Sequence, residues 1–66
     1  MLFQEAFKQS FKAKRPHMKY ALRLDYVEQS FNSENPYTPE EYVEVFGFYE
    51  PMDFEDLKAD DWVAIP

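Results

Sequence analysis

The chain of 66 residues lacks cysteine and has one glycine and one histidine. Without cysteine there is no disulfide framework, no thiolate zinc site and no cysteine nucleophile, and the composition fits a reducing compartment. The single glycine, Gly47, excludes a glycine-rich loop that cradles phosphate groups. The single histidine, His17, cannot form a metal site alone and has no nucleophile motif beside it, so a loop position is its simplest role. We therefore expect no catalytic residues, no cofactor, no metal site and no enzyme activity.

Long apolar runs are absent as well. No stretch approaches the roughly 18 residues of a membrane span, and the N-terminus lacks the apolar region of a secretory signal, so we expect a cytoplasmic protein without membrane contact. Aromatic residues, in contrast, make up 20% of the chain. Because each aromatic side chain buries a large area, residues 1–66 can form a single small domain without disulfides.

Charge is divided unevenly along the chain. Residues 1–23 carry six cations and one acid, a net charge of +5, whereas residues 24–66 carry one cation and twelve acids, a net charge of −11. The simplest interpretation is mutual attraction between these two parts. Two others stay open: the basic part receives an anionic ligand, or the acidic part imitates nucleic acid. Direct nucleic-acid binding is not expected, because the acids outweigh the basic stretch.

The first half of the chain has two clear hydrophobic patterns. Apolar residues at helical spacing predict an amphipathic helix over residues 2–13, ended near Pro16. Alternation over residues 19–26 predicts a strand, with Lys19 and Arg23 on one face and the neighbouring tyrosine on the other. The following polar segment, residues 29–36, ends in Asn-Pro and predicts a loop.

Residues 38–49 are ambiguous. Thr38 as N-cap, Pro39 in the first turn, Glu41 in a capping box and Gly47 at the far end favour a helix. The same segment is rich in valine and aromatic residues that can alternate, and a sheet of only two strands would be marginal in water, which favours a strand. Both interpretations stay open.

The C-terminal segment predicts a short acidic helical turn and a final strand. Asp53 can cap a turn through residues 57–59, and residues 62–65 are typical of a strand. Trp62 is expected to anchor the core, with its indole N–H bonded to a partner. The predicted fold class is α+β, with the N-terminal amphipathic helix packed on a small antiparallel sheet and the acidic turn placed before the C-terminal strand.

Three segments carry a resemblance to known proteins. They are Phe3-Gln4-Glu5-Ala6-Phe7, Lys12-Ala13-Lys14-Arg15-Pro16 and Asp56-Leu57-Lys58-Ala59-Asp60-Asp61-Trp62-Val63. In this order they resemble a small phage protein family that begins with F-x-E-A, continues into a basic strand and closes with D-L-x-A-x-D-W. The family includes the phage Thoeris anti-defence proteins, which are oligomeric sponges for cyclic ADP-ribose-type signalling nucleotides. The resemblance implies a non-enzymatic counter-defence protein of the host cytoplasm, a homo-oligomer that sequesters an anionic cyclic nucleotide at subunit interfaces.

The candidate ligand-binding residues are Arg15, Lys19, Arg23, Asp61 and Trp62. Guanidinium groups can grip phosphate oxygens with two hydrogen bonds, and the lysine adds positive charge beside them. Asp60 and Asp61 could orient a ribose hydroxyl, although a solvated helix end or a hydrogen bond to the tryptophan indole is the simpler interpretation. Pairing of the cations with carboxylates of the same chain is the simpler interpretation for the basic residues.

The alternative hypothesis is an acidic inhibitor that imitates DNA and binds a basic host defence enzyme, such as a nuclease. Duplex DNA carries one charge per about 1.7 Å of its axis, so a mimic needs a dense row of acids. The candidate partner-binding residues are Glu40, Glu41, Glu44, Glu50, Asp53, Glu55, Asp56 and Asp60. A third hypothesis is a structural module with an aromatic homodimer surface.

Overall fold

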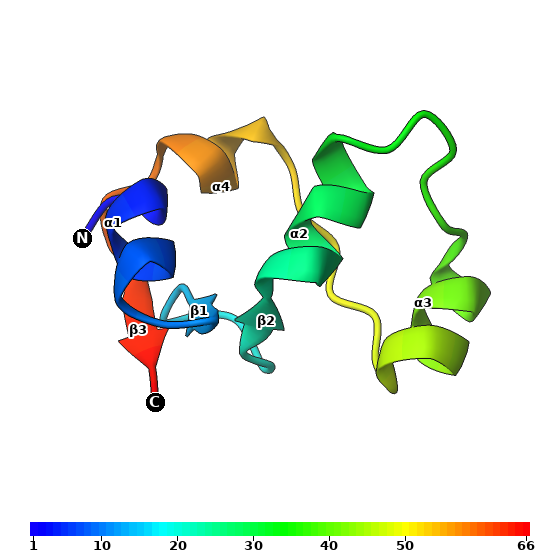
Figure 1. Ribbon diagram of the computed structural model, residues 1–66, viewed down its shortest axis with the longest axis horizontal. Helices are drawn as coiled ribbons and strands as arrows, with labels where there is room; N and C mark the ends of the chain where they lie inside the picture. The colour runs from blue at the N-terminus through cyan, green and yellow to red at the C-terminus, as the bar shows by residue number, and fades with distance from the viewer.

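The computed structural model describes residues 1–66 and contains four helices and three strands. In chain order these are α1 (Phe3–Gln9), β1 (Lys12–Lys14), β2 (Leu22–Arg23), α2 (Leu24–Phe31), α3 (Pro39–Phe46), α4 (Phe54–Lys58) and β3 (Val63–Ile65). The strands form an antiparallel sheet in the order β2-β1-β3, so the last strand lies beside the first. Figure 1 shows α1, α4 and β3 at one end, α2 in the middle and α3 at the opposite end. The predicted α+β class is confirmed.

Most of the ambiguous segment 38–49 forms the helix α3, and the residues predicted to cap it do so. The Thr38 hydroxyl accepts a hydrogen bond from the Glu41 N–H, and the Glu41 carboxylate accepts one from the Thr38 N–H. Gly47 ends the helix with φ of 88°, a left-handed conformation that glycine adopts at little cost. These local bonds satisfy the helix ends, so the segment does not join the sheet.

The predicted acidic turn is confirmed as α4. The Asp53 carboxylate accepts a hydrogen bond from the Asp56 N–H, and the Asp56 carboxylate accepts one from the Asp53 N–H. The final strand is also confirmed, although β3 starts at Val63 rather than at Trp62.

The predicted helix over residues 2–13 is too long, because α1 ends at Gln9. Ser10 has extended backbone, and its hydroxyl donates to the Ile65 carbonyl. Residues 12–14 then form the central strand, which pairs with β2 on one side and β3 on the other. Pairing with a strand some fifty residues away overrides the helical spacing, as tertiary contacts often override local preference.

The predicted strand over residues 19–26 is also wrong for most of its length. Only Leu22–Arg23 is a strand, and helix α2 begins at Leu24 and continues to Phe31, into the segment predicted as a loop. Tyr26 and Val27 are buried on one side of this helix. The alternating apolar residues therefore belong to a short strand followed by a helix, and positions 22 and 26 both reach the core.

The interior has two aromatic clusters. In the Trp62 cluster, defined as Phe3, Phe7 and Trp62, the indole is 1% exposed, and its ring centroid lies 5.4 Å from that of Phe3 and 6.0 Å from that of Phe7. The Tyr26 cluster is larger and comprises Tyr20, Tyr26, Tyr37, Tyr42, Phe46, Phe48 and Tyr49. The expectation that Trp62 anchors the core is confirmed.

Candidate anion-binding site

Arg15 bridges two acidic residues at the Trp62 end of the molecule. Its Nη1 lies 2.7 Å from Asp56 Oδ1 and its Nε lies 2.7 Å from Asp61 Oδ1. The hydrogen bonds to Asp61 and then to Asp56 raise the pKa of the Arg15 guanidinium, and the bond from Arg15 lowers the pKa of Asp61. The positive charge of Arg15 is therefore matched within the chain.

The Trp62 side chain is hydrogen-bonded to α4, the helix that contains Asp56. Its indole Nε1–H donates to the Asp56 carbonyl at 2.7 Å, so the expected partner of the indole exists. The interpretation that Asp60 or Asp61 accepts this bond is wrong, because the acceptor is a backbone oxygen one turn earlier. Arg15 and the buried Trp62, which flank β1 and β3, both bond Asp56 and so hold α4 beside the sheet.

The outer face of the sheet is basic. Lys12 lies directly opposite Arg23 of β2, so both side chains project from the same face, where both are exposed. Lys14, two residues further along β1, projects from this face as well. Ala13 of β1 pairs with Leu22 of β2, and both side chains face inward and are fully buried. The register of the sheet therefore gathers positive charge on one surface.

Arg23 lies among aromatic rings. Its guanidinium carbon is 5.8 Å from the centroid of Phe11 and 5.5 Å from that of Phe46 in α3. Its Nε and Nη2 also donate to the Asp25 carboxylate. Arg23 is therefore paired with an exposed carboxylate of its own chain, and its guanidinium also lies within cation–π distance of two aromatic rings.

Lys19 and Tyr20 lie in the β1–β2 loop rather than in a strand, which corrects their predicted placement on opposite faces. The Lys19 Nζ is 5.4 Å from the centroid of Tyr20. Tyr20 stacks on Phe48 at 4.6 Å, and Phe48 stacks on Tyr26 at 5.0 Å with an interplanar angle of 10°. Tyr20 is the outer ring of this column of three and is 38% exposed.

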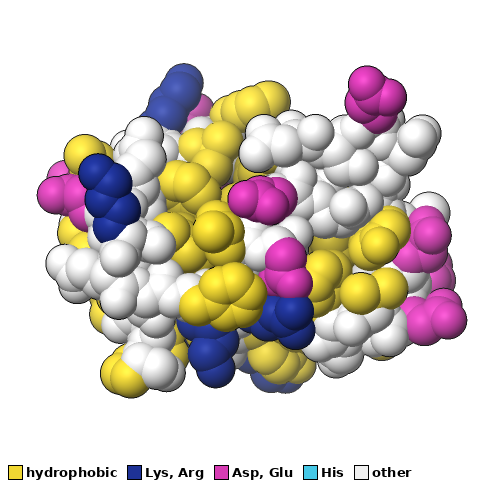
Figure 2. Space-filling model, in the orientation of Figure 1, with side chains coloured by type: hydrophobic (Ala, Val, Ile, Leu, Met, Phe, Trp, Pro, Cys, Tyr) yellow, Lys and Arg dark blue, Asp and Glu magenta, His cyan; other side chains and the backbone are white.

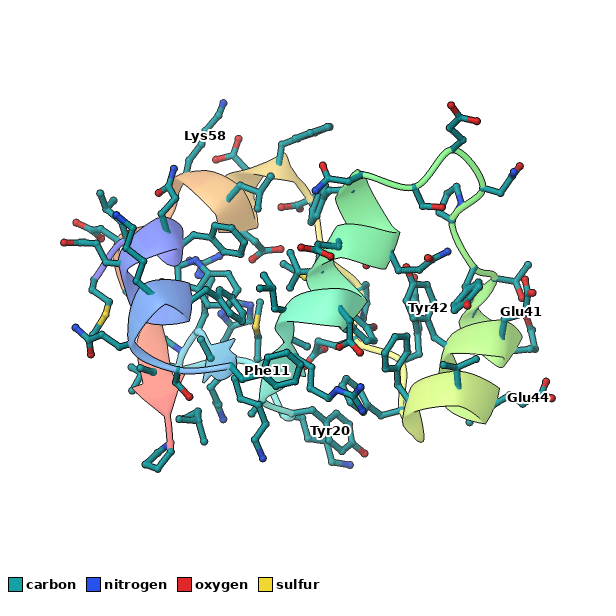
Figure 3. All side chains as sticks on the ribbon, viewed as in Figure 1. Phe11, Tyr20, Glu41, Tyr42, Glu44 and Lys58 are labelled. Carbon is teal, nitrogen blue, oxygen red and sulfur yellow. The ribbon has the colours of Figure 1, made fainter.

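We define the basic aromatic patch as Phe11, Lys12, Lys19, Tyr20 and Arg23. Figure 2 shows Lys and Arg side chains gathered among hydrophobic ones in the lower part of the view, below β1 and β2. Figure 3 labels Phe11 and Tyr20 in this region. Phe11, Lys12 and Tyr20 were missed by the sequence reasoning, although the interleaving of cations with aromatic residues over positions 11–23 was a signal for them.

The lysines of the patch have no acidic partner in the chain. The three ion pairs of the structure involve only Arg15 and Arg23 as cations. The charges of Lys12 and Lys19 therefore remain available to an anion. Of the five predicted ligand-binding residues, the structure brings Lys19 and Arg23 into the patch and uses the other three at the Trp62 end.

The eight candidate acids do not form one row. Glu40, Glu41 and Glu44 are exposed on α3, and Figure 3 shows the two labelled ones, Glu41 and Glu44, pointing away from the rest of the molecule. Three others are used within the fold. The Glu50 carboxylate accepts the Lys19 N–H at 2.9 Å, and Asp53 and Asp56 cap α4.

The remaining two, Glu55 and Asp60, are exposed near the Trp62 end.

The chain encloses no cavity and holds no cluster of metal-ligating side chains. None of its helices has the length and apolar character needed to cross a membrane. Comparisons with protein-family models, with curated proteins and with solved structures give no match to this chain.

Proposed function

We propose that the protein is a non-enzymatic phage counter-defence protein of the host cytoplasm that sequesters an anionic cyclic nucleotide on the basic aromatic patch. The observation that supports this most is the ring column, in which the exposed Tyr20 carries the Lys19 ammonium 5.4 Å from its centroid. Phe48 covers one face of Tyr20, so a planar base can stack on the other face once it displaces the flexible Lys19 side chain from the ring. Base stacking on an aromatic side chain contributes about 1–3 kcal/mol.

The cations around Tyr20 provide the second half of the site. Lys12 and Arg23 are paired across the sheet, and Lys12 and Lys19 have no acidic partner. A phosphate group beside a stacked base would meet these cations, and charge-assisted hydrogen bonds to phosphate are about twice as strong as neutral ones. Base and phosphate are thus recognised by neighbouring side chains on an open surface.

Isothermal titration calorimetry with cyclic ADP-ribose tests this function. We expect the wild-type chain to bind, and Tyr20→Leu and Lys19→Gln each to weaken binding by about tenfold, the effect of losing one stacking or charged contact. Leucine at position 20 keeps apolar contact with Phe48. Lys8→Gln, at an exposed position of α1, and Tyr49→Leu are the matched controls and should bind as the wild type does. No binding by the wild type, or equal losses in the controls, would refute the site.

A second candidate is an inhibitor of a basic host defence enzyme, and α3 favours it. Glu40 and Glu44 are exposed and form no ion pair, and Val43 and Val45 beside them are 51% and 55% exposed. Pull-down from host lysate should then capture a basic protein that is released as salt rises and that Glu40→Gln/Glu44→Gln no longer retains. Retention by this double variant would exclude α3 as the contact.

A further inference from the structure

Helix α3 has one face in the core and one face without a partner. Tyr42 and Phe46 turn inward and contact Tyr26 at ring distances of 4.7 and 5.0 Å. Glu40 and Glu44 therefore lie on the opposite side, because residues two positions from an inward one point away from it on a helix. Exposed valines flank the acids, so the outer surface of α3 is acidic and partly apolar.

The basic aromatic patch has the complementary character. It carries Lys12 and Lys19 without acidic partners, and its aromatic residues Phe11 and Tyr20 are 56% and 38% exposed. Exposed apolar residues of this size, placed among charges, are typical of interaction surfaces. The acids of α3 cannot cover the patch of their own chain, because the inward face of the helix is held on the Tyr26 cluster.

We infer that the protein associates with itself, and that the acidic outer face of α3 in one copy covers the basic aromatic patch of a second copy. Opposite charges then meet across the contact, and the valines of α3 meet the exposed rings. The two surfaces adjoin on each chain, since Arg23 of the patch lies 5.5 Å from the ring of Phe46 in α3. A two-fold pair can therefore form the contact twice, which is the usual symmetry of small homo-oligomers.

This contact goes beyond the proposed function and does not depend on a nucleotide. It also has a consequence for ligand binding, because the partner's carboxylates would occupy the cations that phosphate needs. Self-association and anion binding should compete for the same surface. The contact is predominantly charged at its edges, so raising the salt concentration should weaken it.

A charge-swap experiment tests the contact. We expect Glu40→Lys/Glu44→Lys and Lys12→Glu/Lys19→Glu each to weaken self-association by at least about tenfold, because each change places like charges across the contact. An equimolar mixture of the two variants should associate again, since each then meets the opposite charge on its partner. Sedimentation velocity at low salt measures all three samples, and circular dichroism verifies that each variant is folded.

The matched controls reverse the same number of charges elsewhere. Lys8→Glu/Lys58→Glu and Glu28→Lys/Glu34→Lys change exposed positions outside both surfaces and should associate as the wild type does. A wild-type chain that stays monomeric at millimolar concentration would overturn the inference. So would two variants that associate normally, a mixture that does not recover, or controls that lose association to the same degree.

Discussion

The two ends of the molecule are stabilised in different ways. The Trp62 cluster lies between α1, α4 and the sheet, and ion pairs and backbone hydrogen bonds surround it. Arg15 bridges Asp56 and Asp61, and the backbone N–H of Trp62 donates to the Met1 carbonyl at 3.0 Å. The Tyr26 cluster has stacked rings and hydroxyl groups instead, with the Tyr26 hydroxyl donating to the Glu50 carbonyl at 2.8 Å. Its neighbouring lysines and glutamates have no ionic partners.

This difference separates fold from binding. At the Trp62 end the charges of Arg15, Asp56 and Asp61 match one another and hold together segments distant in sequence, so they are not available to a ligand. At the Tyr26 end the aromatic residues form the packing, and the charges around them remain exposed. Substitutions at the first end should therefore change mainly the free energy of unfolding, and charge substitutions at the second should change mainly binding.

Trp62→Ala should have the largest effect on stability. Truncating a buried tryptophan costs about 3–5 kcal/mol, and it leaves the Asp56 carbonyl without its indole donor. Urea unfolding followed by circular dichroism measures the loss. Phe54→Ala is the matched control, because Phe54 is 70% exposed, and its change should stay within about 0.5 kcal/mol. A Trp62 variant as stable as the Phe54 variant would contradict the role of the Trp62 cluster.

Arg15→Gln should come second, because it leaves the buried carboxylate of Asp56 without its cation. The pKa of Asp61, lowered by the hydrogen bond from Arg15, adds a pH signature. The ionised Asp61 carboxylate stabilises the folded state fully above its ordinary pKa of 3.8, and this stabilisation is lost as the pH falls through the lower pKa of the folded state. Urea midpoints measured from pH 5 downward should fall less steeply in Arg15→Gln. Arg23→Gln is the control: it removes an exposed ion pair and two ring contacts but leaves no buried carboxylate unpaired, so it should be closer to wild type.

Tyr26→Phe should have a smaller effect of about 1–2 kcal/mol, because it removes a hydroxyl that bonds both the carbonyl and the N–H of Glu50. Burial raises the pKa of Tyr26 to about 12. The neutral tyrosine therefore stabilises the fold below its ordinary pKa near 10, and this contribution is lost as the pH rises through 12. Ultraviolet titration should show an ionisation step near pH 12 in the wild type that is missing from the variant.

Lys12→Glu/Lys19→Glu should have the smallest effect on stability, within about 0.5 kcal/mol, because neither lysine has an ionic partner to lose. The same change should abolish calorimetric binding of cyclic ADP-ribose. A variant that unfolds in less urea and binds as before would reverse the proposed separation of roles.

Local capping signals pointed to both α3 and α4, although residues 38–49 were left open between helix and strand because their valines and aromatic residues can also alternate. Thr38, Glu41 and Gly47 lie within one short segment, and the Asp53 turn needs only residues three positions apart, so both structures follow from neighbours in the chain. The limits of α1 and α2 could not be predicted in the same way. Residues 12–14 become a strand by pairing with residues 22–23 on one side and with the distant residues 63–65 on the other.

The candidate site was partly predictable for the same reason. Charge alone indicated Lys19 and Arg23, and both lie in the patch. The partners of Arg15 are 41 and 46 residues away, so spacing could not reveal that its charge is matched. The stacking surface of Tyr20 likewise depends on Phe48 and Tyr26, and Phe48 follows α3 in the chain, far from Tyr20 in sequence.

The central claim is that ligand binds at the basic aromatic patch and not at the Trp62 end. The most direct test is a heteronuclear NMR titration of the wild-type chain with cyclic ADP-ribose. We predict that the amide resonances of Lys19, Tyr20 and Arg23 shift with ligand concentration, while the indole N–H resonance of Trp62 keeps its position. The indole is a sensitive reporter, since it is buried and bonded to the Asp56 carbonyl beside the Arg15 bridge. Shifts centred on Trp62 and Asp61, with none around Tyr20, would contradict the account.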